Sequence, residues 1–235
     1  MNASFVFGIT GGSGAVFAVR LLDVLCASGY DVHLAVSKSG AAVLKQELEI
    51  EVDPRQVDPS ALRLEATPLA AAAAARPIWQ DREADRVTEL IERPRGRERG
   101  SVVCHAIDNY MAPIASGSFL SGGMVICPCS GATMSAIAHG ASTNLIQRAA
   151  DVQLKERRKL ILVPRETPLG SVHLENMRRA SDAGAIVLPA MPGWYHGVQG
   201  LFDLVDFLVA RICDQLGVAH HLMRRWGEPG TGEGG

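Results

Sequence analysis

The chain repeats one unit, in which a short apolar segment is followed by a turn of small residues and then by a helix-like segment. The first unit has a strand expected at residues 5–9, a glycine-rich turn at residues 10–14 and a helix expected at residues 15–26. A second strand is expected at residues 32–36. Segments that are apolar on both faces are typical of strands buried in a parallel sheet. Because parallel strands need crossover connections, the pattern predicts an α/β fold.

The same unit recurs in the second half of the chain. Strands are expected there at residues 124–127, 160–163 and 185–188, and helices at residues 132–138, 145–157, 175–183 and 201–216. In the first half, a helix is also expected at residues 40–48, after the second strand. A chain of 235 residues suits one domain, which we place at residues 1–217. We expect an insertion at about residues 52–100 and a partly disordered C-terminal tail at residues 218–235, in which His220 and His221 are solvated.

The insertion is rich in alanine and in charges of both signs. Residues 70–75 are all alanine, and residues 76–99 hold seven arginines against six acidic residues. Because these charges nearly cancel, the segment is typical of a solvated helix or a flexible loop. A nucleic-acid-binding arm would need an excess of positive charge.

Composition excludes several functional classes. The net charge is -2 and aromatic residues make up 5% of the chain, which argues against a nucleic-acid-binding surface. Five scattered cysteines without a CxxC pair and seven dispersed histidines indicate neither a disulfide scaffold nor a metal site. We find no secretory signal and no apolar run long enough to span a membrane, so we expect a reduced, cytoplasmic setting.

The turn after the first strand is rich in glycine. The segment Gly8-Ile9-Thr10-Gly11-Gly12-Ser13-Gly14 matches neither the GxGxxG pattern nor a Walker A loop. The second strand ends at Ser37 rather than at the acidic residue that would hold the ribose of NAD. These two features favour a mononucleotide, whose phosphate a helix N-terminus can bind, although a tight strand–helix turn would also explain the glycines.

A second candidate loop, Cys127-Pro128-Cys129-Ser130-Gly131-Ala132-Thr133, follows a later strand. Ser130 and Ser37 are each expected to cap the next helix, and both hydroxyls could also contact a phosphate. The two cysteines are expected to be packed thiols. Because the carboxyl ends of parallel strands share one edge of the sheet, these loops and the turn at Arg165 and Glu166 can meet in one crevice.

Several basic residues could bind phosphate there. Arg165 and Glu166 follow a strand and lie between two prolines, which stiffen the turn. Arg211 follows the apolar run at residues 207–210 of a helix, where an arginine either extends to solvent or meets an anion. Arg148 and Lys155 lie on another helix, whose charged end could simply complement the helix dipole.

These motifs resemble those of the UbiX-type flavin prenyltransferases. The resemblance rests on the segments at residues 8–15, 127–130 and 148–158, on Val163-Pro164-Arg165-Glu166-Thr167-Pro168-Leu169 and on Trp194-Tyr195-His196. It covers residues 4–50 and 101–217. It implies a flavodoxin-like, doubly wound parallel sheet with Rossmann-like layers, a site that binds FMN without a metal, and a homo-oligomer, specifically a dodecamer with sites between subunits.

The resemblance also implies a reaction. A dimethylallyl group would pass from dimethylallyl monophosphate to N5 and C6 of reduced FMN, and the prenylated FMN would serve a UbiD-type decarboxylase. FMN would be bound by Gly11, Gly12, Ser13, Ser37, Ser130, Gly131, Ala132, Thr133 and Arg165. Tyr195 and Arg211 would hold the prenyl phosphate, and Arg148, Lys155 and Glu166 would complete the catalytic pocket.

Two alternatives remain open at this point. One is an FMN-dependent cysteine decarboxylase of the same superfamily, although such enzymes typically carry a PASANT-like segment where this chain has CPCSGAT. The other is a non-catalytic carrier of FMN or prenylated FMN, which would not need the cluster of basic residues. The chain departs from the family pattern in its long insertion and in reading GGSG where GASG is commoner.

Overall fold

The computed structural model describes residues 4–64, 67–68 and 98–227. Its centre is a parallel sheet with the strand order β3-β2-β1-β4-β5-β6. The strands are β1 (Ser4–Ile9), β2 (Asp31–Val36), β3 (Val102–Cys104), β4 (Met124–Cys129), β5 (Leu160–Pro164) and β6 (Ile186–Val187). The order reverses between β1 and β4, and in open sheets of this kind ligands bind at such a switch point.

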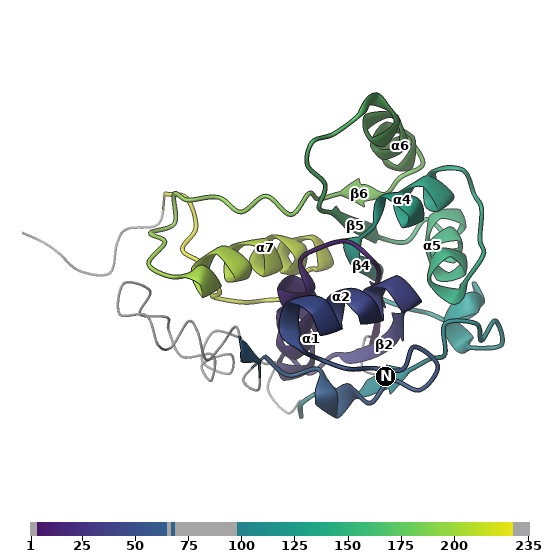
Figure 1. Cartoon of the computed structure of the whole chain (residues 1–235), viewed down its shortest axis with the longest axis horizontal. Coiled ribbons are helices and arrows are strands. Elements are labelled where there is room, and N and C mark those ends of the chain that lie inside the picture. Colours follow the sequence, from purple (N-terminus) through teal and green to yellow (C-terminus); the bar gives the residue numbers. More distant parts are fainter. Residues whose placement is uncertain (1–3, 65–66, 69–97, 228–235) are drawn as a thin grey trace, which may run out of the picture.

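Helices cover both faces of the sheet (Figure 1). They are α1 (Ala15–Ala27), α2 (Lys38–Leu48), α4 (Gly131–Ala138), α5 (Leu145–Lys155), α6 (Ser171–Asp182) and α7 (Leu201–Leu216). One core joins α1, α2 and α7 to one face, and a second core joins α4, α5 and α6 to the other. The structure therefore confirms the doubly wound, three-layer fold with flavodoxin-like and Rossmann-like character.

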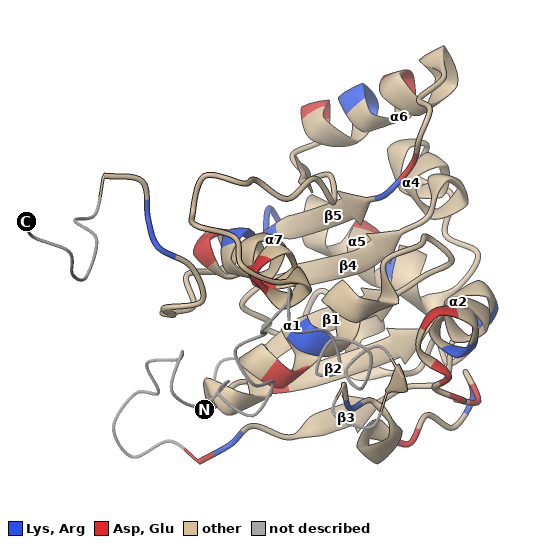
Figure 2. Cartoon of the chain, turned by 60° about the vertical axis from the view of Figure 1, so that its left-hand side comes forward, with Lys and Arg blue, Asp and Glu red and all other residues tan. Residues whose placement is uncertain are grey.

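The two cores follow from the alternation of side chains along each strand. In β1, Phe5, Phe7 and Ile9 belong to the core under α1 and α7, whereas Val6 belongs to the other core. The central strands β1, β4 and β5 contain no Lys, Arg, Asp or Glu, and charges lie mostly on helices and loops (Figure 2). This explains why the strands read as continuous apolar runs in the sequence.

Strand β3 was not predicted from the sequence. It has three residues, and among the described strands it lies at the edge of the sheet and pairs with β2 alone, with Val32 opposite Val102. The carboxylate of Asp31 accepts hydrogen bonds from the backbone and side chain of Ser101 at 2.8 and 2.7 Å, which holds the edge strand in register. Such a short strand depends on its neighbour rather than on a local pattern.

The C-terminal segment at residues 218–227 returns along α7 (Figure 1). Val218, His220 and Leu222 are buried. The prediction that His220 is solvated is therefore wrong, because its side chain packs beneath this segment and bonds to Asp214 of α7. The prediction for the last eight residues, 228–235, and most of the prediction for the insertion, residues 69–97, fall outside the described residues.

Candidate functional site

Thr10, directly after β1, connects two strand-end loops at the switch point. Its hydroxyl donates to the carbonyl of Pro128 at 2.8 Å and accepts from the backbone N–H of Ser130 at 2.8 Å. Its own backbone N–H also donates to the Pro128 carbonyl, at 3.2 Å. A single buried threonine thus fixes the glycine turn after β1 against the loop after β4.

The glycines of the first turn lie in close contact with two other loops. A Cβ atom on Gly11 would be 2.5 Å from the Cβ of Ser39, and one on Gly12 would be 3.1 Å from the Cβ of Pro128. A Cβ on Gly40, in the first turn of α2, would be 2.5 Å from the Ile9 carbonyl. The loops after β1, β2 and β4 therefore converge, as the strand-end pattern predicts.

Both predicted serine caps are present. Ser37 accepts from the backbone N–H of Gly40 at 3.0 Å, and Ser130 accepts from that of Thr133 at 3.3 Å. The Ser130 hydroxyl also donates to the hydroxyl of Thr133 at 3.0 Å. A helix begins with several unbonded N–H groups, and each serine satisfies one of them. The remaining groups at the starts of α2 and α4 give this edge a positive potential suited to an anion.

The start of α1 is already occupied by a carboxylate. Glu47 of α2 accepts hydrogen bonds from the backbone N–H groups of Gly14 and Ala15 at 2.9 and 2.8 Å. This residue was missed in the sequence. The helical spacing of Gly40, Leu44 and Glu47 could have indicated its role, because it places Glu47 next to the face of α2 that is buried against the core.

Arg165 and Glu166 follow β5 on the same edge, and both are exposed. A Cβ atom on Gly131, the first residue of α4, would be 4.0 Å from a carboxylate oxygen of Glu166 and 3.7 Å from the ring of His173. His173, also missed in the sequence, accepts at Nδ1 from the backbone N–H of Gly170 at 3.1 Å. The turn after β5 therefore forms a fourth wall of the loop cluster.

The two cysteines of β4 are packed thiols, as predicted. Cys127 and Cys129 are both fully buried. Burial raises the pKa of Cys129 to about 12 and that of Cys127 still further, so both remain protonated at neutral pH. A protonated, buried thiol is a poor nucleophile, which leaves these residues a packing role.

Arg148 and Lys155, on α5, contact neither the glycine turn nor Arg165 within one chain. Arg148 donates to the carbonyl of Ala115 at 3.1 Å and pairs with Asp151 at 2.8 Å. Lys155 pairs with Glu156 at 2.5 Å. These contacts tie both residues to the face of the molecule formed by α5 and the loop before β4.

Tyr195 and Arg211 both adjoin the C-terminal segment. The ring of Tyr195 lies 5.7 Å from that of Phe207 on α7 and 5.3 Å from that of Trp226. Arg211 pairs with Asp214 at 2.8 Å, and the same carboxylate binds Arg225 at 2.9 Å. Arg225 and Trp226, adjacent in sequence, thus link the two predicted substrate-binding residues.

Lys155 and Arg211 lie toward the edge of the sheet opposite the loop cluster. At that edge Lys159, directly before β5, donates to the carbonyl of Gln215 in the last turn of α7 at 2.7 Å. Lys155 lies four residues before Lys159 in the sequence. Arg211 lies four residues before Gln215, about one helical turn away in α7. At roughly 3.3 Å per residue, the six-residue strand β4 separates the two edges by roughly 17 Å. One chain therefore does not bring these two residues to the loop cluster.

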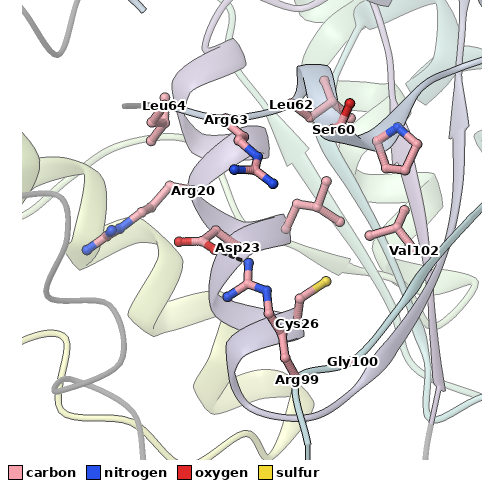
Figure 3. Close-up of a pocket in the computed structure, with 12 residues that line it drawn as sticks. Arg20, Asp23, Cys26, Ser60, Leu62, Arg63, Leu64, Arg99, Gly100 and Val102 are labelled. Carbon is pink, nitrogen blue, oxygen red and sulfur yellow. Dashed lines mark hydrogen bonds and ion pairs between the residues drawn. The ribbon is translucent and has the colours of Figure 1, made fainter. Parts of the chain in front are cut away.

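A cavity of about 510 Å³ lies elsewhere, between α1 and the two described ends of the insertion, residues 59–64 and 99–100 (Figure 3). Its basic residues include Arg20, which is paired with Asp206, and Arg99, which is paired with Asp23. The cavity does not include the strand-end loops, so it is distinct from the candidate site. Among the described residues, no group of three or more His, Cys, Asp or Glu could hold a metal ion.

The geometry can be compared with known proteins. The Flavoprotein family model matches residues 1–213. The flavin prenyltransferase UbiX of Alkalihalophilus pseudofirmus is 44% identical over 221 residues, which cover 94% of this chain and 94% of that protein. The chain belongs to the UbiX family of flavin prenyltransferases. Membership of this family makes it a transferase.

Solved structures of UbiX proteins agree with this assignment. AnUbiX (PadA1), in complex with FMN and dimethylallyl pyrophosphate, has a TM-score of 0.75 and 31% identity, with 98% of this chain and 100% of that chain covered. A dodecameric FMN-dependent UbiX-like decarboxylase from Escherichia coli O157:H7 has a TM-score of 0.69 and 33% identity, with 96% and 100% covered. In the described part of this UbiX-family chain, no helix is both long and apolar enough to cross a membrane.

The loop cluster fits a flavin nucleotide. At Gly11 a side chain would meet Ser39, so only glycine lets the turn after β1 pack this closely against the start of α2. The starts of α2 and α4 offer N–H groups and the hydroxyls of Ser37 and Ser130 to a phosphate. The carboxylate of Glu47 excludes the start of α1 from that role, because two anions would repel each other there.

Proposed function

We propose that this protein joins a dimethylallyl group from dimethylallyl monophosphate to N5 and C6 of reduced FMN, and that the prenylated FMN serves a UbiD-type decarboxylase. The observation that carries the proposal is the convergence of four strand-end loops on one edge of the sheet in a UbiX-family chain. Reduced FMN supplies the two nucleophilic atoms of the reaction. The protein supplies binding, orientation and charge.

The loop cluster would bind the flavin. Ser37 and the first turn of α2, with Ser130 and Thr133 of α4, would surround its phosphate and sugar, and Arg165 would add a guanidinium. Gly11, Gly12 and Ser13 would let the first turn approach the ligand, and Gly131 and Ala132 would line the same pocket. This assignment predicts that substitutions in the loops after β1, β2 and β4 weaken FMN binding directly.

The phosphate of the prenyl donor would be held by Tyr195 and Arg211, with Arg148 and Lys155 completing the pocket. Breaking the allylic C–O bond leaves positive character on carbon and additional negative charge on the departing phosphate. Fixed cationic donors stabilise that charge as it develops, and the loss of one such donor typically costs about 2.7–4 kcal/mol of barrier. The guanidinium and ammonium groups would thus supply the positive charge that the leaving group needs.

Glu166 is the candidate for proton handling. Its carboxylate faces the start of α4 from the turn after β5, so it lies at the wall of the proposed flavin pocket. Forming the bond at C6 releases a proton, which requires a base within hydrogen-bonding reach. Either Glu166 or the released phosphate would accept this proton.

The site would be shared between subunits of a homo-oligomer, in the proposed form a dodecamer. This follows from the position of Lys155 and Arg211, which lie toward the edge of the sheet opposite the loop cluster of their own chain. Complementation tests it. A variant lacking the flavin side of the site, Ser130→Trp, and one lacking the phosphate side, Arg211→Ala, should each be inactive. Co-expressed with different tags and purified as mixed oligomers, they should regain activity, whereas no recovery would contradict sharing.

The proposed reaction is tested by mass analysis of the flavin. The protein is incubated anaerobically with reduced FMN and dimethylallyl monophosphate, and the small molecules are then separated from it. The expected product carries one dimethylallyl unit on the flavin and restores activity to a UbiD-type decarboxylase prepared without its cofactor. An unmodified flavin, despite FMN binding, would reject the transferase proposal and favour a carrier.

A further inference from the structure

The carboxylate of Asp214 binds three side chains at once. It accepts from Nη1 of Arg211 at 2.8 Å, from Nη2 of Arg225 at 2.9 Å and from Nε2 of His220 at 3.1 Å. The two arginines come from different segments, since Arg211 lies on α7 and Arg225 follows it in the C-terminal segment. One acidic residue therefore brings two guanidinium groups together.

His220 acts in this cluster as a neutral donor. The backbone N–H of Leu222 donates to Nδ1 of His220 at 3.3 Å, so Nδ1 is the acceptor and Nε2 carries the proton given to Asp214. The side chain of His220 is 1% exposed, which fixes it behind the carboxylate. His220 and Arg225 both bond to Oδ1 of Asp214, and Arg211 donates to Oδ2.

The charges of the cluster leave it positive. Two guanidinium groups and one carboxylate give a net charge of about +1, because arginine remains protonated at all relevant pH values. Burial opposes ionisation of Asp214, but its hydrogen bonds to Arg225 and His220 outweigh this effect and lower its pKa. The side chains of Arg211 and Arg225 are 42% and 47% exposed, so each is partly accessible from solvent.

The cluster adjoins the other residue assigned to the prenyl phosphate. Trp226, next to Arg225, contacts the ring of Tyr195. A phosphate near Tyr195 and Arg211 would therefore also lie near Arg225. Two planar guanidinium groups held by one carboxylate suit a phosphate, which can accept paired N–H donors from a guanidinium.

We propose that Asp214 is a positioning residue that holds Arg211 and Arg225 together as one clamp for the phosphate of the prenyl donor, with Arg225 as a phosphate-binding residue in addition to Arg211. This inference rests on the proposed function. Without the carboxylate, two adjacent guanidinium groups repel each other, and two long side chains must be ordered when the phosphate binds. Asp214 removes most of that cost before binding.

The test compares Asp214→Asn and Arg225→Gln with the wild-type protein. Each variant should raise KM for dimethylallyl monophosphate by roughly tenfold, the scale expected for ordering one further side chain, and leave FMN affinity within about twofold. Because Asp214 acts through Arg225, the double variant should bind the donor only slightly more weakly than either single variant. Arg225→Lys should recover part of the affinity. Asp182→Asn removes a similar partner from Arg178 on α6 and serves as the control.

Two results would overturn the clamp. The first is an unchanged KM in Asp214→Asn while the wild-type protein is active, which would leave the proposed function standing. The second is an equal fall in thermal stability, FMN affinity and kcat, which would indicate a purely structural role. Should the wild-type protein fail to prenylate FMN, calorimetric titration of the FMN-bound protein with dimethylallyl monophosphate decides the clamp alone. Weaker binding by Asp214→Asn supports it, and equal or absent binding in both proteins rejects it.

Discussion

Replacement of Gly11 by alanine tests the convergence of the loops most sharply. The new Cβ would lie 2.5 Å from the Cβ of Ser39, an atom fixed to the backbone of α2, so the turn after β1 and the start of α2 must separate. Gly12→Ala is the matched control, because its Cβ would lie 3.1 Å from Pro128 and needs only a small shift. Neither glycine has a positive φ, so alanine adopts the backbone conformation at both positions.

The expected magnitude follows from two opposing effects. Overpacking in a close contact typically costs about 1–3 kcal/mol. Replacing glycine by alanine recovers about 0.4–1 kcal/mol by restricting the unfolded chain. The balance for Gly11→Ala is a loss of about 1–2 kcal/mol, which lowers Tm by about 2–8 °C in a protein of this size. For Gly12→Ala the two effects nearly cancel.

The assay measures thermal unfolding and FMN affinity, the latter by quenching of flavin fluorescence. We expect Gly11→Ala to lower Tm and to weaken FMN binding by at least tenfold, because the separated loops no longer match the ligand. Gly12→Ala, the control for the steric effect, should retain the wild-type Tm. Normal stability and normal FMN affinity in Gly11→Ala would refute the reasoning that these loops form one site.

Three further predictions address other parts of the structure. Arg211→Ala should abolish prenylation in the anaerobic mass assay and leave FMN affinity nearly intact, and a collapse of FMN binding would show that its role is assigned wrongly. Asp206→Ala leaves Arg20 buried without the carboxylate that binds it at 2.7 Å, which should cost about 3–5 kcal/mol in urea unfolding, whereas Glu51→Ala in an exposed pair should change little. Burial lowers the pKa of His33 and His105 from the usual 6.5. Below about pH 6.5 the unfolded chain therefore binds more protons at these two residues than the folded protein does. Stability should therefore decline from that pH downward, and less so in a His33→Gln, His105→Gln double variant; an identical decline would contradict this cause.

The local pattern of the sequence was sufficient to predict most of the fold. Five of the six strands lie within apolar runs that the sequence shows, and Ser37 and Ser130 lie directly before helices, where a hydroxyl can cap. Strand β3 could not be found in this way, because three residues at an edge form a strand only through their partner. The convergence of the loops followed from the rule that parallel strands end at one edge.

Contacts between distant segments could not be predicted. Glu47 reaches the start of α1 only because α1 and α2 pack together, and Asp214 joins Arg211 to Arg225 only because the chain returns along α7. His220 was expected in solvent for the same reason, since its burial depends on that return. The position of Lys155 and Arg211 toward the opposite edge also emerges only when the helices are placed on the sheet.

The most direct measurement is a crystal structure of the assembled protein with FMN bound. The account predicts the flavin against Gly11, Ser37 and Ser130 of one subunit, with Arg165 on the same wall and Lys155, Tyr195 and Arg211 around the dimethylallyl end of the pocket, some of them from neighbouring subunits. A flavin bound in another cavity, or a pocket that none of these three residues reaches in any subunit, would contradict it.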